Sequence, residues 1–247
     1  MAINQIRLNP SAVARALGAV AFLLVLASIG GQLTKYLLGH DVVYGLVSLF
    51  YVDAEQNIPT LFSVLLLFCA ALLLTVITVL KKKQKDPDVS RWAILAFGFL
   101  FMAVDEAWSI HERLITPVRG LLGDGPLGIF YFAWVIPGIA VVLVLTLFLL
   151  RFLLRLPAKT RFTFMVAGTL FIGGALGIEL VGGRYAELHG QENLTYSMIV
   201  TVEESLEMAG VIVFIYALLK YIADHYEEVR FRFDDFEGNS RSNAPKT

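Results

Sequence analysis

Eight side chains in this sequence have the chemical types and the spacing to bind a cation or to exchange protons. Four of them lie between positions 105 and 112, one lies at 179, and three lie between 203 and 207: Asp105, Glu106, His111, Glu112, Glu179, Glu203, Glu204 and Glu207. Carboxylates joined by one or two histidines hold hard or borderline divalent cations. Carboxylates inside a membrane also form proton relays.

Helical geometry favours a shared position for these side chains. At 100° per residue, Asp105 and Glu112 are expected to lie within about 20° of each other on one helix face. The glutamates between 203 and 207 occupy an arc of about 100° on another helix. Glu179 follows a glycine-rich segment, and small residues let membrane helices approach closely. We therefore expect the helices that carry these groups to bring them together.

The lengths of the apolar runs place the acids inside a membrane. Met208–Leu219, which follows Glu207, would be about 18 Å long as a helix, whereas the hydrocarbon core is about 30 Å thick. A spanning helix must therefore carry the glutamates between 203 and 207 into the membrane. Each such carboxylate costs about 2.5–3.5 kcal/mol on insertion scales, and residues of this kind usually face the interior of a bundle.

The composition indicates a membrane protein. Of the 247 residues, 57% are hydrophobic and 17% are charged, and the mean hydropathy is +0.70. Soluble domains contain about 25% charged residues. Six stretches are long and apolar enough to cross a bilayer: Ala12–Tyr36, Pro59–Leu80, Trp92–Ile115, Leu127–Leu154, Phe162–Gly182 and Tyr196–Tyr221. The sequence thus predicts an all-α bundle of six transmembrane helices over residues 1–223. A cytoplasmic, partly disordered tail is expected over residues 224–247.

The distribution of charges predicts the orientation. Lys and Arg are retained on the cytoplasmic side, and six crossings place 16 of the 20 there, leaving Lys35, Arg113, Arg119 and Arg184 outside. Of the 21 Asp and Glu residues, 13 fall in the outer half. Both termini are therefore expected in the cytoplasm, with the chain in a bacterial-type inner (plasma) membrane and the acidic groups near the outer face.

Three functions fit this pattern. The first is a site for a divalent metal (Fe, Mn, Zn or Ca) formed by all eight side chains, in a membrane metalloenzyme that acts on a lipid or another membrane-soluble substrate. Glu112 or Glu204 would then be the general base. The alternatives are a proton or cation translocator, and a non-catalytic subunit of a membrane complex.

The remaining expectations concern polarity and partners. The inner half is almost wholly apolar, with Ser63, Thr75, Thr78 and Thr169 as its polar members, which favours a one-sided site over a path through the membrane. Membrane lipid is the expected partner, and no motif for nucleic acid is present. Another membrane protein or a second copy of the chain is left open as a further partner.

Overall fold

The computed structural model describes residues 9–40, 43–123 and 125–226, so most of the predicted cytoplasmic tail lies outside the described residues. The described part is helical and contains no strand. Its helices are α1 (Pro10–Leu38), α2 (Leu46–Phe50), α3 (Ile58–Lys83), α4 (Val89–Trp108), α5 (Ile115–Leu122), α6 (Val135–Arg155), α7 (Ala158–Ile172), α8 (Glu179–His189) and α9 (Leu194–His225). A π-helical segment, Gly173–Ile178, joins α7 to α8, and short 3₁₀ turns cover Val43–Gly45, Glu112–Leu114 and Gly128–Phe130.

Asparagine side chains define where three of the long helices begin. Asn9, Asn57 and Asn193 each accept hydrogen bonds from backbone N–H groups in the first turn of α1, α3 and α9. Such caps satisfy donors that have no partner within the helix. Pro10 and Pro59 occupy first-turn positions, where a missing N–H costs nothing. Polar caps therefore mark the boundaries of segments that are otherwise apolar.

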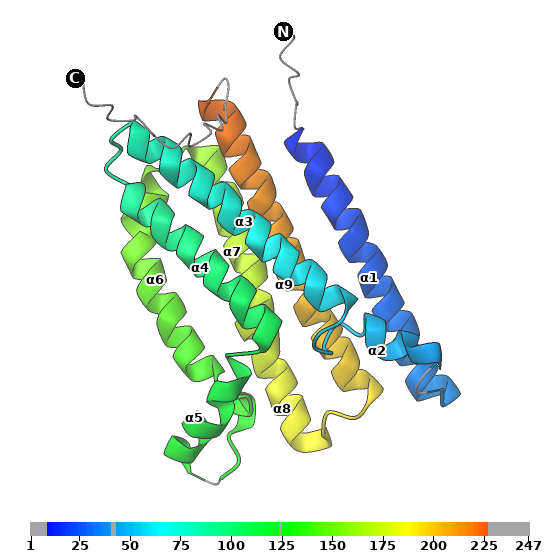
Figure 1. Cartoon of the computed structure of the whole chain (residues 1–247). Helices are drawn as coiled ribbons and strands as arrows, with labels where there is room; N and C mark the ends of the chain where they lie inside the picture. Colours follow the sequence, from blue (N-terminus) through cyan, green and yellow to red (C-terminus); the bar gives the residue numbers. More distant parts are fainter. Residues whose placement is uncertain (1–8, 41–42, 124, 227–247) are drawn as a thin grey trace, which may run out of the picture.

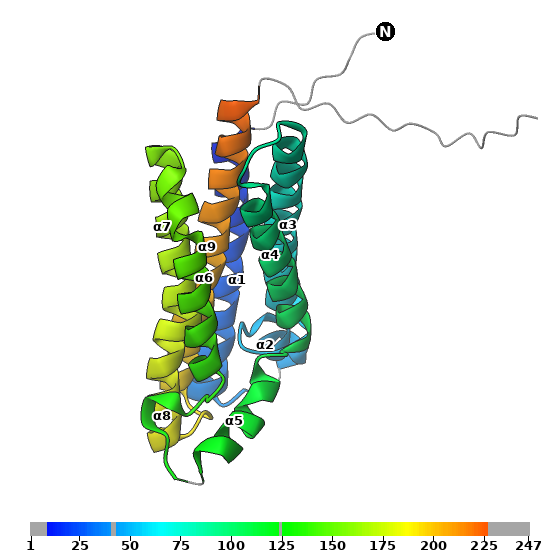
Figure 2. The ribbon, with the colours of Figure 1, turned by 90° about the vertical axis from the view of Figure 1, so that its left-hand side faces the viewer.

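Five helices are long and apolar enough to cross a membrane: α1, α3, α6, α9 and the continuous α7–α8 unit. A sixth crossing results if α4 is counted with the segment Glu112–Leu122, which is bent from it by 76°. The arrangement is that of a multi-pass membrane protein. Helix α9 lies at its centre and packs against α1, α3 and α7, while α3 packs along α4 (Figures 1 and 2).

The two ends of the bundle differ in charge. The start of α1, the α3–α4 and α6–α7 connections and the end of α9 lie together (Figure 1). These segments carry the lysines of 81–85, the arginines of 151–161 and Lys220, and we call this the basic end. The opposite end holds α2, α5 and α8 together with the predicted site residues, and we call it the acidic end.

Aromatic side chains fill the half of the bundle nearer the basic end. The Trp92 ring lies 5.0 Å from Phe152 and 5.1 Å from Tyr221, and Phe214 lies 4.7 Å from Phe164. Leu74, Ile77 and Leu218 are fully buried in the same core. This half is therefore a tightly packed apolar layer joining α3, α4, α6, α7 and α9.

Two expected helix boundaries were wrong. The third apolar stretch is not a straight helix to Ile115, because α4 ends at Trp108, where Ser109 adopts a left-handed conformation (φ 45°). Glu112 therefore leaves the helix face that carries Asp105. The fourth stretch begins its helix at Val135 instead of Leu127. Pro137 falls in the first turn of α6, where it breaks no helical hydrogen bond.

Candidate functional site

Two carboxyl groups from different helices meet near the middle of the acidic half. Glu203 on α9 is only 8% exposed, and its side chain lies within hydrogen-bonding reach of Glu179 at the start of α8. Two ionised carboxylates have no hydrogen to share, so this contact forms a hydrogen bond only if one of them carries a proton. Glu203 Oε2 is buried and accepts no hydrogen bond from the described residues.

Close helix packing produces this meeting of α8 and α9. A Cβ at Gly174, in the π-helical segment, would lie 2.8 Å from the carbonyl oxygen of Glu203, and one at Gly210 would lie 2.7 Å from the backbone nitrogen of Phe171. Only glycine permits these approaches. The π-helical segment carries the chain directly into Glu179, and such segments frequently occur at functional sites. Of the glycines before Glu179, Gly174 lies against α9, whereas a Cβ at Gly173 or Gly177 would have no atom within 4 Å.

A second group of side chains lies next to the carboxyl group of Glu179. The indole N–H of Trp134 donates to Glu179 Oε1 at 2.9 Å, and the Trp134 ring lies 4.5 Å from the ring of His111. Asp105 accepts from the His111 backbone N–H through one oxygen, and its other oxygen lies 2.8 Å from His111 Nδ1. Asp105 therefore fixes the turn that follows α4 and orients the imidazole toward Trp134 and the acidic groups.

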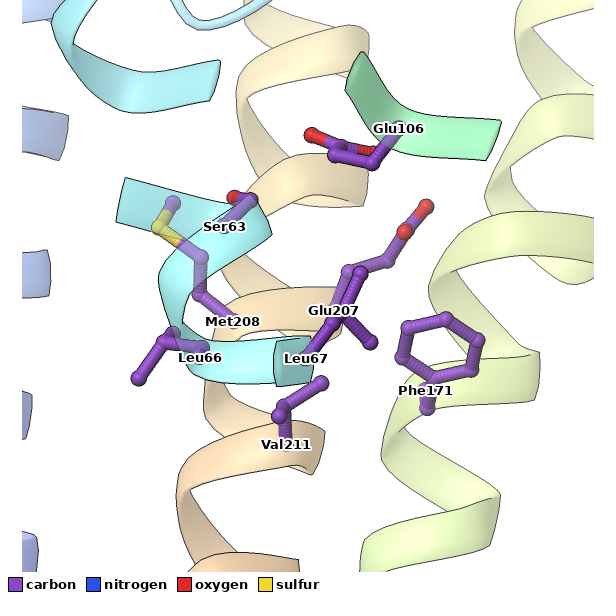
Figure 3. A pocket seen from close by; sticks show the side chains of 8 residues that line it. All are labelled: Ser63, Leu66, Leu67, Glu106, Phe171, Glu207, Met208 and Val211. Carbon is purple, nitrogen blue, oxygen red and sulfur yellow. The ribbon is translucent and has the colours of Figure 1, made fainter. Parts of the chain in front are cut away.

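A small cavity separates Glu106 of α4 from Glu207 of α9 (Figure 3). Both carboxyl groups and the hydroxyl of Ser63 lie at one end of the cavity, while Phe171 and Val211 are among the apolar residues at the other (Figure 3). Its open volume is about 10 Å³, which is room for about one water molecule. Ser63, expected in the apolar inner half, thus belongs to the acidic half.

The remaining predicted site residues are placed less centrally. Glu204 is half-buried on α9 beside the two glutamates already described, and Glu112 is exposed in the turn after α4. The structure therefore places Glu179 with Glu203, Glu106 with Glu207, and Asp105 with His111. It separates Glu112 from the helix face on which it was expected.

No cationic partner balances the central carboxyl groups. Among the described residues, no Lys or Arg forms an ion pair with Glu106, Glu179 or the glutamates of 203–207. In the same part of the chain, no three His, Cys, Asp or Glu side chains are arranged to hold a metal ion. Glu179 instead contacts the carboxyl group of Glu203 and the indole N–H of Trp134.

Sequence reasoning missed two contributors to this site. Trp134 lies just before α6, and its indole N–H donates a hydrogen bond to Glu179. Ser63 lies on the wall of the Glu106–Glu207 cavity. For Trp134 a signal existed, because a partly buried indole N–H usually requires an acceptor. For Ser63 no pattern in the sequence pointed to the acidic groups.

A family model matches residues 14–222 and is described as a domain of unknown function, DUF8692. The chain belongs to this family. The match begins in the first turns of α1 and ends near the end of α9, so all the carboxyl groups above lie within the DUF8692 domain. No curated protein and no solved structure matches the chain.

Proposed function

We propose that this DUF8692 protein is a proton-binding membrane protein whose acidic groups exchange protons with the outer side. The observation that carries the proposal is the Glu179–Glu203 contact, in which the buried Glu203 meets another carboxyl group and, among the described residues, no Lys or Arg. Two negative charges in contact repel strongly in a medium of low dielectric constant. One shared proton removes the repulsion and supplies the missing hydrogen bond.

The proposal includes the orientation. Lys and Arg are retained on the cytoplasmic side, so the basic end faces the cytoplasm and the acidic end faces outward, in a bacterial-type inner membrane. Protons would then reach Glu203 from the outside, past the exposed Glu112 and the half-buried Asp105 and His111.

The apolar layer near the basic end supports one-sided exchange. Its aromatic rings are in mutual contact. Thr75 and Thr78 donate to carbonyl groups of their own helix, at 2.8 Å each, so they offer no free hydroxyl proton to a neighbour. On this proposal the packed layer closes the route to the basic end, and translocation would require the layer to open.

A divalent metal at Glu106 and Glu207 is the second candidate, and the cavity between these residues favours it. Carboxylate and hydroxyl oxygens are suitable ligands for Mn²⁺ or Ca²⁺. Glu106, Glu207 and Ser63 would hold the ion, which would supply a Lewis acid for activating water. Glu204, on the same helix as Glu207, and Glu112 are the general bases proposed for that chemistry.

Replacing Glu203 by Gln tests the proton proposal, and the response of the wild type to a chelator distinguishes it from the metal candidate. Gln has the shape and the hydrogen-bonding capacity of a protonated glutamic acid, so Glu203→Gln should melt at the same temperature as the wild type or higher, with or without chelator. Glu55→Gln, at an exposed residue of the same end, is the matched control, and its melting temperature should equal that of the wild type with and without chelator.

If a metal is the resident ion, chelation should instead lower the melting temperature of the wild type, because a ligand stabilises only the state that binds it. That result, with bound metal found by elemental analysis, would contradict the proton proposal.

A further inference from the structure

The basic end contains a cavity that is separate from the acidic groups. Its volume is about 200 Å³, and it lies between the end of α3, the α3–α4 connection, the end of α6 and the end of α9. The floor is formed by Trp92, Phe152 and Tyr221, whose rings are in mutual contact. The cavity is therefore apolar inside, polar at its mouth, and several times larger than the space one water molecule takes up.

The mouth of the cavity has more cationic donors than its own acids use. Lys81 donates to Asp86 at 2.9 Å. Asp88 accepts from Arg91 at 2.7 Å and also from Arg155 through the same oxygen. Two cations of the cavity lining, Lys81 and Arg155, together with Arg91 outside the lining, thus serve two carboxylates. Lysine has three N–H donors and arginine has five, so N–H groups on Lys81 and Arg155 stay available for another acceptor.

A buried donor strengthens this imbalance. Arg91 Nε lies next to these pairs, is buried, and donates to no acceptor in the described part of the chain. The half-exposed Arg155 side chain lies where the cavity meets the surface. Arginine is suited to phosphate because its planar fork can donate two parallel hydrogen bonds.

The surface beside the mouth suits an acyl chain. Leu147 and Leu154 are seven residues apart on α6 and are 73% and 58% exposed, so they lie on one outward face that ends at Arg155. A lipid lying along this face would bring its head group to the level of Arg155. Basic pockets between membrane helices on the cytoplasmic side bind anionic head groups.

We propose that this cavity binds a phosphate group at Lys81 and Arg155, supplied by the head group of an anionic phospholipid or by free phosphate. The aromatic floor would accommodate the glycerol part of a head group. The proposal does not depend on the proton-binding function, because the two sites share no residue.

Melting temperatures of the purified chain in a neutral detergent test the proposal. Phosphatidylglycerol, phosphatidylcholine and inorganic phosphate are added separately. We expect phosphatidylglycerol to raise the melting temperature and phosphatidylcholine to have little effect, because only the former carries a net negative charge. A rise with inorganic phosphate as large as that with phosphatidylglycerol would support the phosphate site and identify the free anion as its source.

Arg155→Gln should weaken the apparent affinity for the effective ligand about tenfold, because it removes a charged donor of hydrogen bonds to the phosphate. Lys159→Gln removes the same charge from an exposed residue outside the cavity and should leave the affinity unchanged. If Arg155→Gln fails to fold, Lys81→Gln is judged by the same criterion. The proposal would be overturned if neither phosphatidylglycerol nor inorganic phosphate raised the melting temperature. It would also be overturned if Arg155→Gln and Lys159→Gln weakened the affinity equally.

Discussion

The side-chain interactions of the acidic half centre on Glu179, which meets Glu203 on one side and Trp134 on the other. Trp134 donates an uncharged hydrogen bond to the carboxyl group of Glu179. Its hydrogen bond holds Glu179 in place and satisfies one lone pair of a carboxyl group that forms no ion pair with Lys or Arg in the described part of the chain. The indole N–H therefore contributes to stability as well as to the position of the Glu179–Glu203 pair.

Trp134→Phe tests this role. The change keeps an aromatic ring but removes the N–H donor, so it should lower the free energy of unfolding by about 1–2 kcal/mol. Trp108→Phe is the matched control, because the Trp108 side chain is 59% exposed and its nitrogen donates no hydrogen bond to the described residues. Thermal melting in neutral detergent measures both. Equal losses in the two variants would show that ring size, and not the hydrogen bond, explains the effect.

At the scale of the elements, the site depends on how closely α7 and α9 pack. Gly210→Ala would place a methyl group 2.7–2.9 Å from backbone atoms of Phe171 and Ala167. Backbone atoms cannot rotate away, so the helices must separate, at a cost of about 1–3 kcal/mol. Gly98→Ala on α4 has no atom within 4 Å of the new methyl group and should be neutral or slightly stabilising, because alanine favours helices. A loss of stability in Gly98→Ala as large as in Gly210→Ala would contradict this account.

The α3–α4 connection has its own pH dependence. Burial opposes ionisation of Asp86, but hydrogen bonds from Lys81 and from the backbone N–H of Asp88 outweigh it and hold the pKa of Asp86 below its usual range. Stability from Asp86 is therefore present above the pKa of the unfolded chain, near 4, and is lost as the pH falls through the lower folded pKa. Asp86→Asn should melt below the wild type at neutral pH, and the difference should shrink in acid. Asp224→Asn, at an exposed residue of the same end, is the control, and a difference independent of pH would refute the role of Asp86.

Much of this organisation follows from the sequence, because apolar length and caps such as Asn57 before Pro59 are local signals. The bend after Trp108 was not predicted, since it depends on Ser109 adopting a left-handed conformation that Asp105 and His111 stabilise by hydrogen bonds. The pairing of Glu179 with Glu203 also depends on tertiary contact. Helical periodicity indicated which acids share a helix face, but it could not show which face meets which.

For the whole molecule, the separation of a basic end from an acidic end predicts the orientation. Single cysteines at Gln84 and at Gln191, both exposed and at opposite ends, would be introduced in a Cys69→Ala background. Because Lys and Arg are retained in the cytoplasm, an impermeant thiol reagent should label Gln191→Cys in intact cells and should label Gln84→Cys only after lysis. Labelling of Gln84→Cys in intact cells would show that the orientation is the opposite one, with the acidic groups on the cytoplasmic side.

The central claim is that the contact between Glu179 and Glu203 contains a proton and no metal ion. Infrared spectroscopy of the chelated protein at neutral pH observes this directly, through the carbonyl stretch of a protonated carboxyl group. We expect this band in the wild type and in Glu55→Gln, and a loss of intensity in Glu203→Gln. A wild-type spectrum without the band, or a band that is unchanged in Glu203→Gln, would contradict the account.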